Sequence, residues 1–168
     1  MSGAVGPPDF ESYVAPRRVS LRRTAYLLTG DWDRAEDVVQ EALARLFVHW
    51  RKAQRAGSVD AYCRRAVVNA FLSEGRRPWR RERSTDRVPE QGYADPAGSS
   101  DERDALRRAL AELGPSQRAI VVLRYWDDLS VEETAAVVGT SAGNVKSQSA
   151  RGLARLREVL DAVEVDHD

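Results

Sequence analysis

The sequence of 168 residues is poor in the side chains that build redox and metal chemistry. It has one cysteine, Cys63, so an intramolecular disulfide and a cysteine-rich metal site are both excluded. Its two histidines, His49 and His167, stand far apart in the sequence. There is no glycine-rich phosphate loop, nucleophile elbow or metal-ligand spacing. We therefore expect no enzyme, and we predict no catalytic residue, cofactor or metal ligand.

Long apolar runs are also missing. The sequence contains no 18 consecutive apolar residues, which excludes an ordinary membrane span. The first residues, MSGAVGPPDFES, lack the basic segment and apolar run of a signal peptide. These two absences predict a cytoplasmic protein without membrane insertion.

Net charge is the third absence, because 26 basic side chains balance 26 acidic ones. The charges are unevenly spread, however. Residues 1–90 carry 17 basic and 12 acidic side chains, whereas residues 91–168 carry 9 and 14. Local patches, and not the total charge, decide which surface of a protein meets a polyanion.

What the sequence does contain is helical periodicity, with no alternating strand pattern beside it. Residues 33–50 place apolar side chains at steps of three and one, which predicts an amphipathic helix. We also predict helices over residues 10–28, with a kink at Pro16, and over residues 60–74. The apolar stripe of the first of these consists of Ala35, Val38, Val39, Ala42, Leu43, Leu46, Phe47 and Trp50.

The segment 84–101 is rich in Pro, Gly, Ser and Asp and has no periodicity, which is typical of a linker. After it, Ser99 with Glu102 and Ser130 with Glu133 are capping-box signals for two helix starts. Gly114-Pro115 separates two further helices. We predict an all-α fold of two small helical domains joined by a flexible linker, with bounds 8–83, 84–101 and 102–163. The acidic tail, residues 164–168, is expected to be disordered.

A helix-turn-helix pattern lies near the C-terminus. Ala135 is the small residue where the first helix packs, Gly139 suits a left-handed turn position, and Val145 anchors the second helix. Ser141 can cap that second helix. Residues 142–157 contain four basic side chains and no acidic one, which favours contact with DNA.

The second helix presents polar side chains away from its anchor, and their chemistry fits the major groove of DNA. Lysine and arginine reach guanine O6 and N7 or phosphates, while asparagine and glutamine can read adenine. The predicted DNA-binding residues are Asn144, Lys146, Ser147, Gln148 and Arg151.

Together the two halves resemble the extracytoplasmic-function group of sigma-70 family initiation factors. Region 2.1–2.2 of that family is similar to LRRTAYLLTGDWDRAEDVVQEALARLF, and region 2.3–2.4 to DAYCRRAVVNAFLSEGRR. Regions 4.1 and 4.2 are similar to ALAELGPSQRAIVVLRYWDDLSVEETAAVVGTSAGNVKSQSARGLARLR. The ending VKSQSARGLARLR is most similar to a sigma-E-like subgroup common in actinobacteria. The likeness is interrupted only at the linker.

The resemblance implies an alternative sigma factor that binds core RNA polymerase and recognises the −10 and −35 promoter elements. The first domain would bind the β′ clamp helices and the −10 element, and the second the −35 element and the β flap. An anti-sigma factor is a further implied partner. The residues implied for the clamp helices are Asp37, Gln40 and Glu41, and for the −10 element Tyr62, Arg64, Arg65, Asn69, Arg76 and Arg77.

Some positions depart from the family pattern or have a plain structural reading. Gln148 replaces a common arginine, which would alter the −35 preference, and Thr134 stands where Ile or Leu is usual. Tyr62 is as well explained by a core position as by stacking on a base. Cys63, inside a helix, is better explained as a small apolar core residue than as a redox sensor.

A stand-alone dimeric helix-turn-helix regulator is the alternative function. Its dimer seam would be the long terminal helix, through Leu153, Leu156, Leu160 and Val163. We prefer the reading in which this helix packs back on its own domain. The alternative also leaves the acidic face of residues 33–50 without a role.

Overall fold

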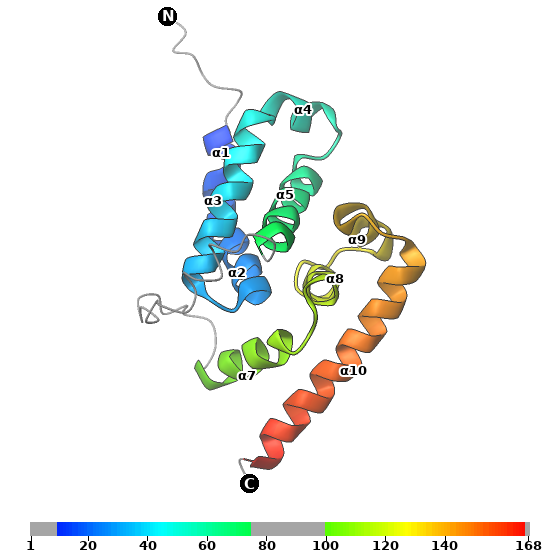
Figure 1. Ribbon diagram of the computed structural model, residues 1–168. Coiled ribbons are helices and arrows are strands. Elements are labelled where there is room, and N and C mark those ends of the chain that lie inside the picture. The colour runs from blue at the N-terminus through cyan, green and yellow to red at the C-terminus, as the bar shows by residue number, and fades with distance from the viewer. Residues whose placement is uncertain (1–9, 75–99, 167–168) are drawn as a thin grey trace, which may run out of the picture.

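The computed structural model describes residues 10–74 and 100–166, and the regular structure in both ranges is helical. Residues 10–74 form the N-lobe and residues 100–166 the C-lobe (Figure 1). The N-lobe consists of α1 (Phe10–Val14), the 3-10 turn η2 (Ala15–Arg17), α2 (Arg18–Thr29), α3 (Trp32–Val48), α4 (Trp50–Arg55) and α5 (Val59–Glu74). The C-lobe consists of α7 (Ser100–Ala111), α8 (Pro115–Tyr125), α9 (Val131–Val138) and α10 (Ala142–Asp166).

Helix α3 is the centre of the N-lobe. It begins at an N-cap, where the Asp31 carboxylate accepts hydrogen bonds from the backbone N–H groups of Asp33 and Arg34 at 2.8 and 3.2 Å. Its apolar stripe packs against α2 and α5. The predicted kink at Pro16 is confirmed, because the 3-10 turn separates α1 from α2 there.

Two details of the predicted helix 33–50 are wrong. The helix ends at Val48, and after His49 the buried Trp50 begins the separate short helix α4. Phe47, predicted to lie in the buried stripe, is 61% exposed. It lies on the last turn of α3, where its ring meets the edge of Phe10 at 5.2 Å between centroids.

The helix-turn-helix of the C-lobe follows its sequence signals. Ser130 and Glu133 form a reciprocal capping box at the start of α9. Gly139 ends α9 with φ of 77°, the left-handed conformation that glycine adopts without strain. The Ser141 hydroxyl accepts from the Asn144 N–H at 3.1 Å, and Val145 is fully buried. All four expectations are confirmed.

Helix α10 lies along α7, α8 and α9 (Figure 1). Its buried residues, Val145, Ser149, Gly152 and Leu156, recur at steps of four and three and form one narrow seam. The helix therefore packs back on its own lobe, as preferred from the sequence. It continues to Asp166, so the part of the acidic tail that the structure describes is helical and was wrongly expected to be disordered.

Thr134 stands at a fully buried position of α9 where the family usually has a larger aliphatic side chain. Its hydroxyl donates to the backbone oxygen of Ser130 at 2.8 Å. Because that bond satisfies the hydroxyl, the polar atom adds no unpaired group to the core.

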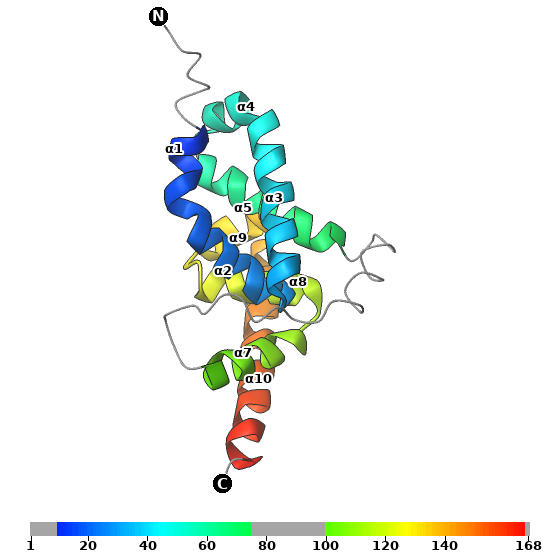
Figure 2. The ribbon, with the colours of Figure 1, turned by 90° about the vertical axis from the view of Figure 1, so that its left-hand side faces the viewer.

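The two lobes pack against each other, with α5 on α9 and α2 on α7 and α8 (Figure 2). Arg118 of α8 is one polar link between them. Its guanidinium donates to the Leu28 oxygen at the end of α2 at 2.6 Å, and also to carbonyl oxygens of its own lobe. Those oxygens belong to Leu110 at 2.8 Å, Leu113 at 2.9 Å and Ala111 at 3.5 Å. One cation thus satisfies the open carbonyl ends of α2 and α7.

Candidate functional site

The residues predicted to bind the polymerase share one face of α3. Asp37 and Gln40 are exposed and Glu41 is half-buried, at the spacing of three and four that places side chains together on a helix. Glu41 pairs with Arg45 at 3.3 Å, four residues along the same helix. This face of α3 thus carries an exposed carboxylate, Asp37, and an exposed amide, Gln40, beside the Glu41–Arg45 pair.

The residues predicted for the −10 element are only partly brought together. Of the four on α5, Asn69 is exposed and Tyr62 packs against the core with part of its ring accessible. Arg65 donates to the Ala136 oxygen of α9 at 3.0 Å, so its guanidinium is engaged by the C-lobe. Arg64 faces the junction of the lobes. Arg76 and Arg77 lie outside the described residues.

Cys63 is a core residue, as expected. Its side chain is 2% exposed, and burial raises the pKa of its thiol to about 11. Because the thiolate is the reactive form, a thiol with so high a pKa stays protonated and unreactive at neutral pH.

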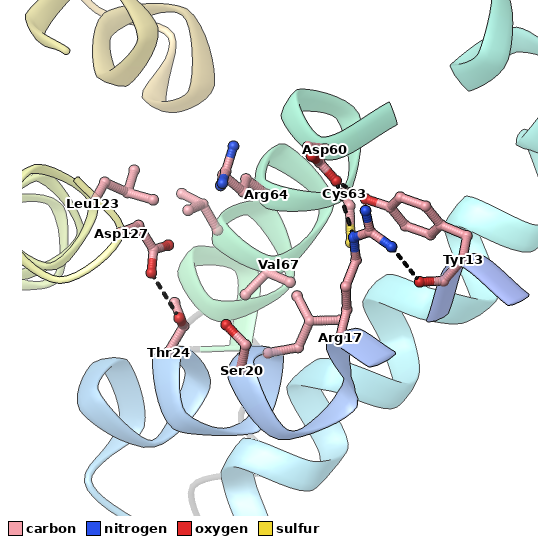
Figure 3. Close-up of a pocket in the computed structure, with 12 residues that line it drawn as sticks. Tyr13, Arg17, Ser20, Thr24, Asp60, Cys63, Arg64, Val67, Leu123 and Asp127 are labelled. Carbon is pink, nitrogen blue, oxygen red and sulfur yellow. Dashed lines mark hydrogen bonds and ion pairs between the residues drawn. The ribbon is translucent and has the colours of Figure 1, made fainter. Parts of the chain in front are cut away.

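A pocket of about 210 Å³ lies where α2 and α5 meet the end of α8 (Figure 3). On one side the Asp60 carboxylate accepts from the Tyr13 hydroxyl and pairs with Arg17 at 3.2 Å. On the other side Thr24 of the N-lobe donates to Asp127 of the C-lobe at 2.9 Å. Burial raises the pKa of both Tyr13 and Asp127.

The pocket offers little chemistry of its own, because its carboxylates already have partners. In residues 10–74 and 100–166 there is no group of three His, Cys, Asp or Glu side chains that could hold a metal ion. Nor does any helix in these ranges have the length and apolar character to cross a membrane. The pocket is best described as the incompletely filled part of the contact between the lobes.

The residues predicted to read the −35 element lie on α10, on the side away from its seam. Asn144, Lys146, Ser147 and Arg151 are exposed. Asn144 donates from its amide to the Thr140 hydroxyl at 2.9 Å, which orients it at the start of the helix. Gln148 is half-buried and accepts a hydrogen bond from Gln117 of α8 at 2.9 Å.

Two residues of consequence escape sequence reasoning. Arg118 joins the lobes, and burial together with the nearby positive charge of Arg34 lowers the pKa of its guanidinium. Gln117 of α8 donates a hydrogen bond to Gln148 of α10, which lies 31 positions further along the chain. Neither is marked by periodicity or by a local motif. The sequence shows only that Gln117 and Arg118 are polar residues next to the apolar stripe of α8.

Comparison with known proteins agrees with both halves of this picture. The family model for sigma-70 region 2 matches residues 14–81, and the model for sigma-70 region 4 matches residues 103–156. The RNA polymerase sigma-E factor of Streptomyces coelicolor is 41% identical over 94% of this chain and 89% of its own length. An extracytoplasmic-function sigma factor of Mycolicibacterium smegmatis, SigE, is 34% identical over 91% of this chain and 62% of its own.

Solved structures support the same fold. The chain is similar to the sigma factor RpoE of Bartonella quintana, solved in complex with the anti-sigma factor NepR, with a TM-score of 0.75. That similarity has 28% sequence identity and covers 91% of this chain and 97% of the other. Similarity to CnrH, solved with the cytosolic domain of CnrY, has a TM-score of 0.66 over 91% of this chain and 88% of the other, at 23% identity.

An all-α protein with a region 2 lobe and a helix-turn-helix region 4 lobe is of the sigma-factor class. The chain belongs to the sigma-70 family, and within it to the extracytoplasmic-function sigma factors similar to sigma-E of actinobacteria. Its function is accordingly that of an alternative sigma factor, which works with RNA polymerase in transcription initiation.

Proposed function

We propose that the two lobes divide the work of promoter recognition between them. The domain spanning residues 8–83 docks core polymerase through Asp37, Gln40 and Glu41 of α3 and contacts the −10 element through residues of α5 and the segment after it. The domain spanning residues 102–163 reads the −35 element with α10 and contacts the β flap. The observation that carries this proposal is the exposure of Asp37 and Gln40 on the side of α3 that faces away from its core.

The proposed −10 set consists of Tyr62, Arg64, Arg65, Asn69, Arg76 and Arg77. Asn69 supports it best, because an exposed amide on a buried helix can pair with the edge of an unstacked base. The arginines supply phosphate contacts. With the two lobes packed together, the Arg65 guanidinium donates a hydrogen bond to the Ala136 oxygen. Its proposed −10 role therefore requires Arg65 to exchange this hydrogen bond for a contact with DNA.

Several further inferences rest on the same role. The protein acts by binding and is not an enzyme, since positioning polymerase on a promoter needs no chemistry from the sigma factor itself. It works in the cytoplasm, where its polymerase and promoters are. An anti-sigma partner is supported by the similarity to a sigma factor solved with one.

The dimeric regulator finds less support. Its seam would need the apolar side of α10, but Leu156 is buried within the C-lobe and Leu153 and Leu160 pack against the same core. A dimer would therefore have to separate α10 from its own lobe.

The test is co-elution of the protein with sigma-free core RNA polymerase from Streptomyces coelicolor in size-exclusion chromatography. We expect the wild type to co-elute and the triple variant Asp37→Ala, Gln40→Ala, Glu41→Ala to elute alone. The matched control, Gln54→Ala, Asp161→Ala, Glu164→Ala, removes the same side-chain types from exposed positions elsewhere and should co-elute. A wild-type protein that elutes as a DNA-binding dimer, apart from polymerase, would establish the regulator instead.

A further inference from the structure

Helices α8 and α10 cross at a point where two successive turns of each helix are in contact. Gly152 of α10 lies against Val121 of α8, so closely that a Cβ atom on Gly152 would be 2.5 Å from Val121 Cγ2. One turn earlier on each helix, the Gln117 amide Nε2 donates to Gln148 Oε1 at 2.9 Å. The close approach at Gly152 and this hydrogen bond thus lie on adjacent turns of the same helix crossing.

In this hydrogen bond Gln148 accepts through its oxygen. A glutamine amide carries an oxygen that accepts and an NH2 group that donates, on opposite sides of the same carbon. Because the Gln148 oxygen points at α8, its NH2 group points away from α8. Asn144, one turn before it, is held differently: its nitrogen donates to Thr140, which leaves its oxygen available.

We propose that Gln117 is a positioning residue for promoter reading, which holds Gln148 so that it offers only donors to DNA. The inference rests on the proposed function of α10 as the reader of the −35 element. In the major groove, guanine presents N7 and O6 and thymine presents O4 as acceptors. Adenine is read by an amide through a donor and an acceptor together, and Gln148 held in this way has lost the acceptor.

This assignment gives the departure from the family pattern a physical meaning. Gln148 stands where an arginine is common in the family, and arginine is a donor without an acceptor. With its oxygen turned inward, Gln148 keeps that donor character without the charge. Gln117 therefore determines which bases Gln148 can recognise, although Gln117 lies in a different helix.

Three substitutions test the assignment. In Gln117→Glu the carboxylate can only accept, so the Gln148 NH2 group turns inward and its oxygen faces DNA. In Gln117→Lys the ammonium donates as the native amide does, so the orientation of Gln148 is kept. In Gln148→Ala the reading group is removed. As a fallback, Gln117→Met removes the polar partner without adding charge, and frees Gln148 to read adenine as well.

Each variant is assembled with Streptomyces coelicolor core polymerase. A promoter is first selected by wild-type holoenzyme from fragmented genomic DNA of that organism. Run-off transcription is then measured from this promoter and from every single-base change in its −35 element. Thermal melting followed by circular dichroism checks that each variant is folded.

We expect the wild type and Gln117→Lys to prefer guanine or thymine at one base pair, and Gln117→Glu to prefer adenine or cytosine there. The change in relative promoter use should be about tenfold, at the lower end of what one base contact discriminates. Gln148→Ala should lose preference at that pair alone. If Gln117→Glu is unfolded, Gln117→Met should gain adenine at the same pair.

The outcomes separate this inference from the function on which it rests. Suppose that wild-type holoenzyme initiates at specific promoters but Gln117→Glu has the same base preference as the wild type. This result would overturn the role of Gln117 and leave the sigma-factor function intact. Where Gln117→Glu is unfolded, an unchanged base preference in Gln117→Met would have the same meaning. An unchanged profile in Gln148→Ala would overturn it in the same way. If wild-type holoenzyme initiates on no fragment, the proposed function itself fails, and the inference fails with it.

Discussion

Helices α5 and α10 are both proposed to touch DNA, yet they are built into the molecule in opposite ways. In α5, seven of sixteen residues are buried, and the helix packs between α3 on one side and α9 on the other. In α10, four of twenty-five residues are buried, in one narrow seam. Changes on α5 therefore test the fold as much as the function, whereas most of α10 can vary without disturbing its support.

The largest effect on stability is expected at Phe71 on α5. Phe71→Ala removes a ring that is 5% exposed and should lower the free energy of unfolding by about 3–5 kcal/mol, through lost burial and the cavity left behind. Urea denaturation at pH 7 measures it. The control Asn69→Ala, exposed on the same helix, should change stability by less than about 0.5 kcal/mol. Equal effects would show that α5 is not a core helix.

An intermediate effect is expected at the single tight point of α10. Gly152→Ala places a methyl group against the buried Val121 and should cost about 1–3 kcal/mol, since a packed site has no room for it. The control Gly143→Ala on the same helix meets no atom within 4 Å and should be neutral or slightly stabilising. Urea denaturation should show a loss of stability in Gly152→Ala that Gly143→Ala does not share. Equal losses in the two variants would contradict the close approach of α8 and α10.

The smallest effect is expected at Asp127, where the C-lobe closes over the N-lobe. Burial raises the pKa of Asp127 in the folded protein, so the folded state holds this proton more tightly than the unfolded chain does. Asp127 therefore makes the free energy of unfolding fall as pH rises from about 4, the ordinary aspartate pKa, through the raised value. Asp127→Asn keeps an oxygen for Thr24 and should be more stable than wild type above that range.

The measurement is urea denaturation of Asp127→Asn and wild type at pH 4, 5.5 and 7, with the stability difference growing toward neutral pH. The matched control is Asp128→Asn, an exposed neighbour with φ of 57°, a conformation that asparagine tolerates as aspartate does. Its difference from wild type should show less change with pH than that of Asp127→Asn. A difference for Asp127→Asn that is constant with pH would contradict the burial argument.

Most of the fold follows from local signals. The periodicity of residues 33–50, the capping box at Ser130 and the left-handed turn at Gly139 each act within a few residues, so a sequence alone displays them. The exposed set on α10 follows from the same periodicity, because Val145 fixes which side of the helix faces the core. Cys63 could be assigned to the core on other grounds, because a thiol inside a helix usually behaves as a small apolar side chain.

What could not be predicted depends on contacts between distant segments. The Arg65 bond to the Ala136 oxygen joins residues 71 positions apart, and the Arg118 bond to Leu28 joins residues 90 positions apart. Gln148 looked like its exposed neighbours until Gln117 was placed beside it. Phe47 was misassigned because an apolar stripe shows which side of a helix faces the core, but it does not show where the neighbouring helices end.

The hydrogen bonds of Arg118 fall into two groups, one that joins the lobes and one that lies within the C-lobe. Three of the four carbonyl oxygens that Arg118 binds belong to its own lobe. Separation of the lobes would therefore break one of its four hydrogen bonds, together with the Arg65–Ala136 and Thr24–Asp127 hydrogen bonds, and would keep its three bonds to the α7 end. The positive charge of Arg34 lies close enough to be felt by Arg118, and distance would relieve that repulsion. The contacts that Arg118 makes within the C-lobe therefore do not depend on the N-lobe, and neither does the packing of α10, the helix proposed to read DNA, on α7, α8 and α9.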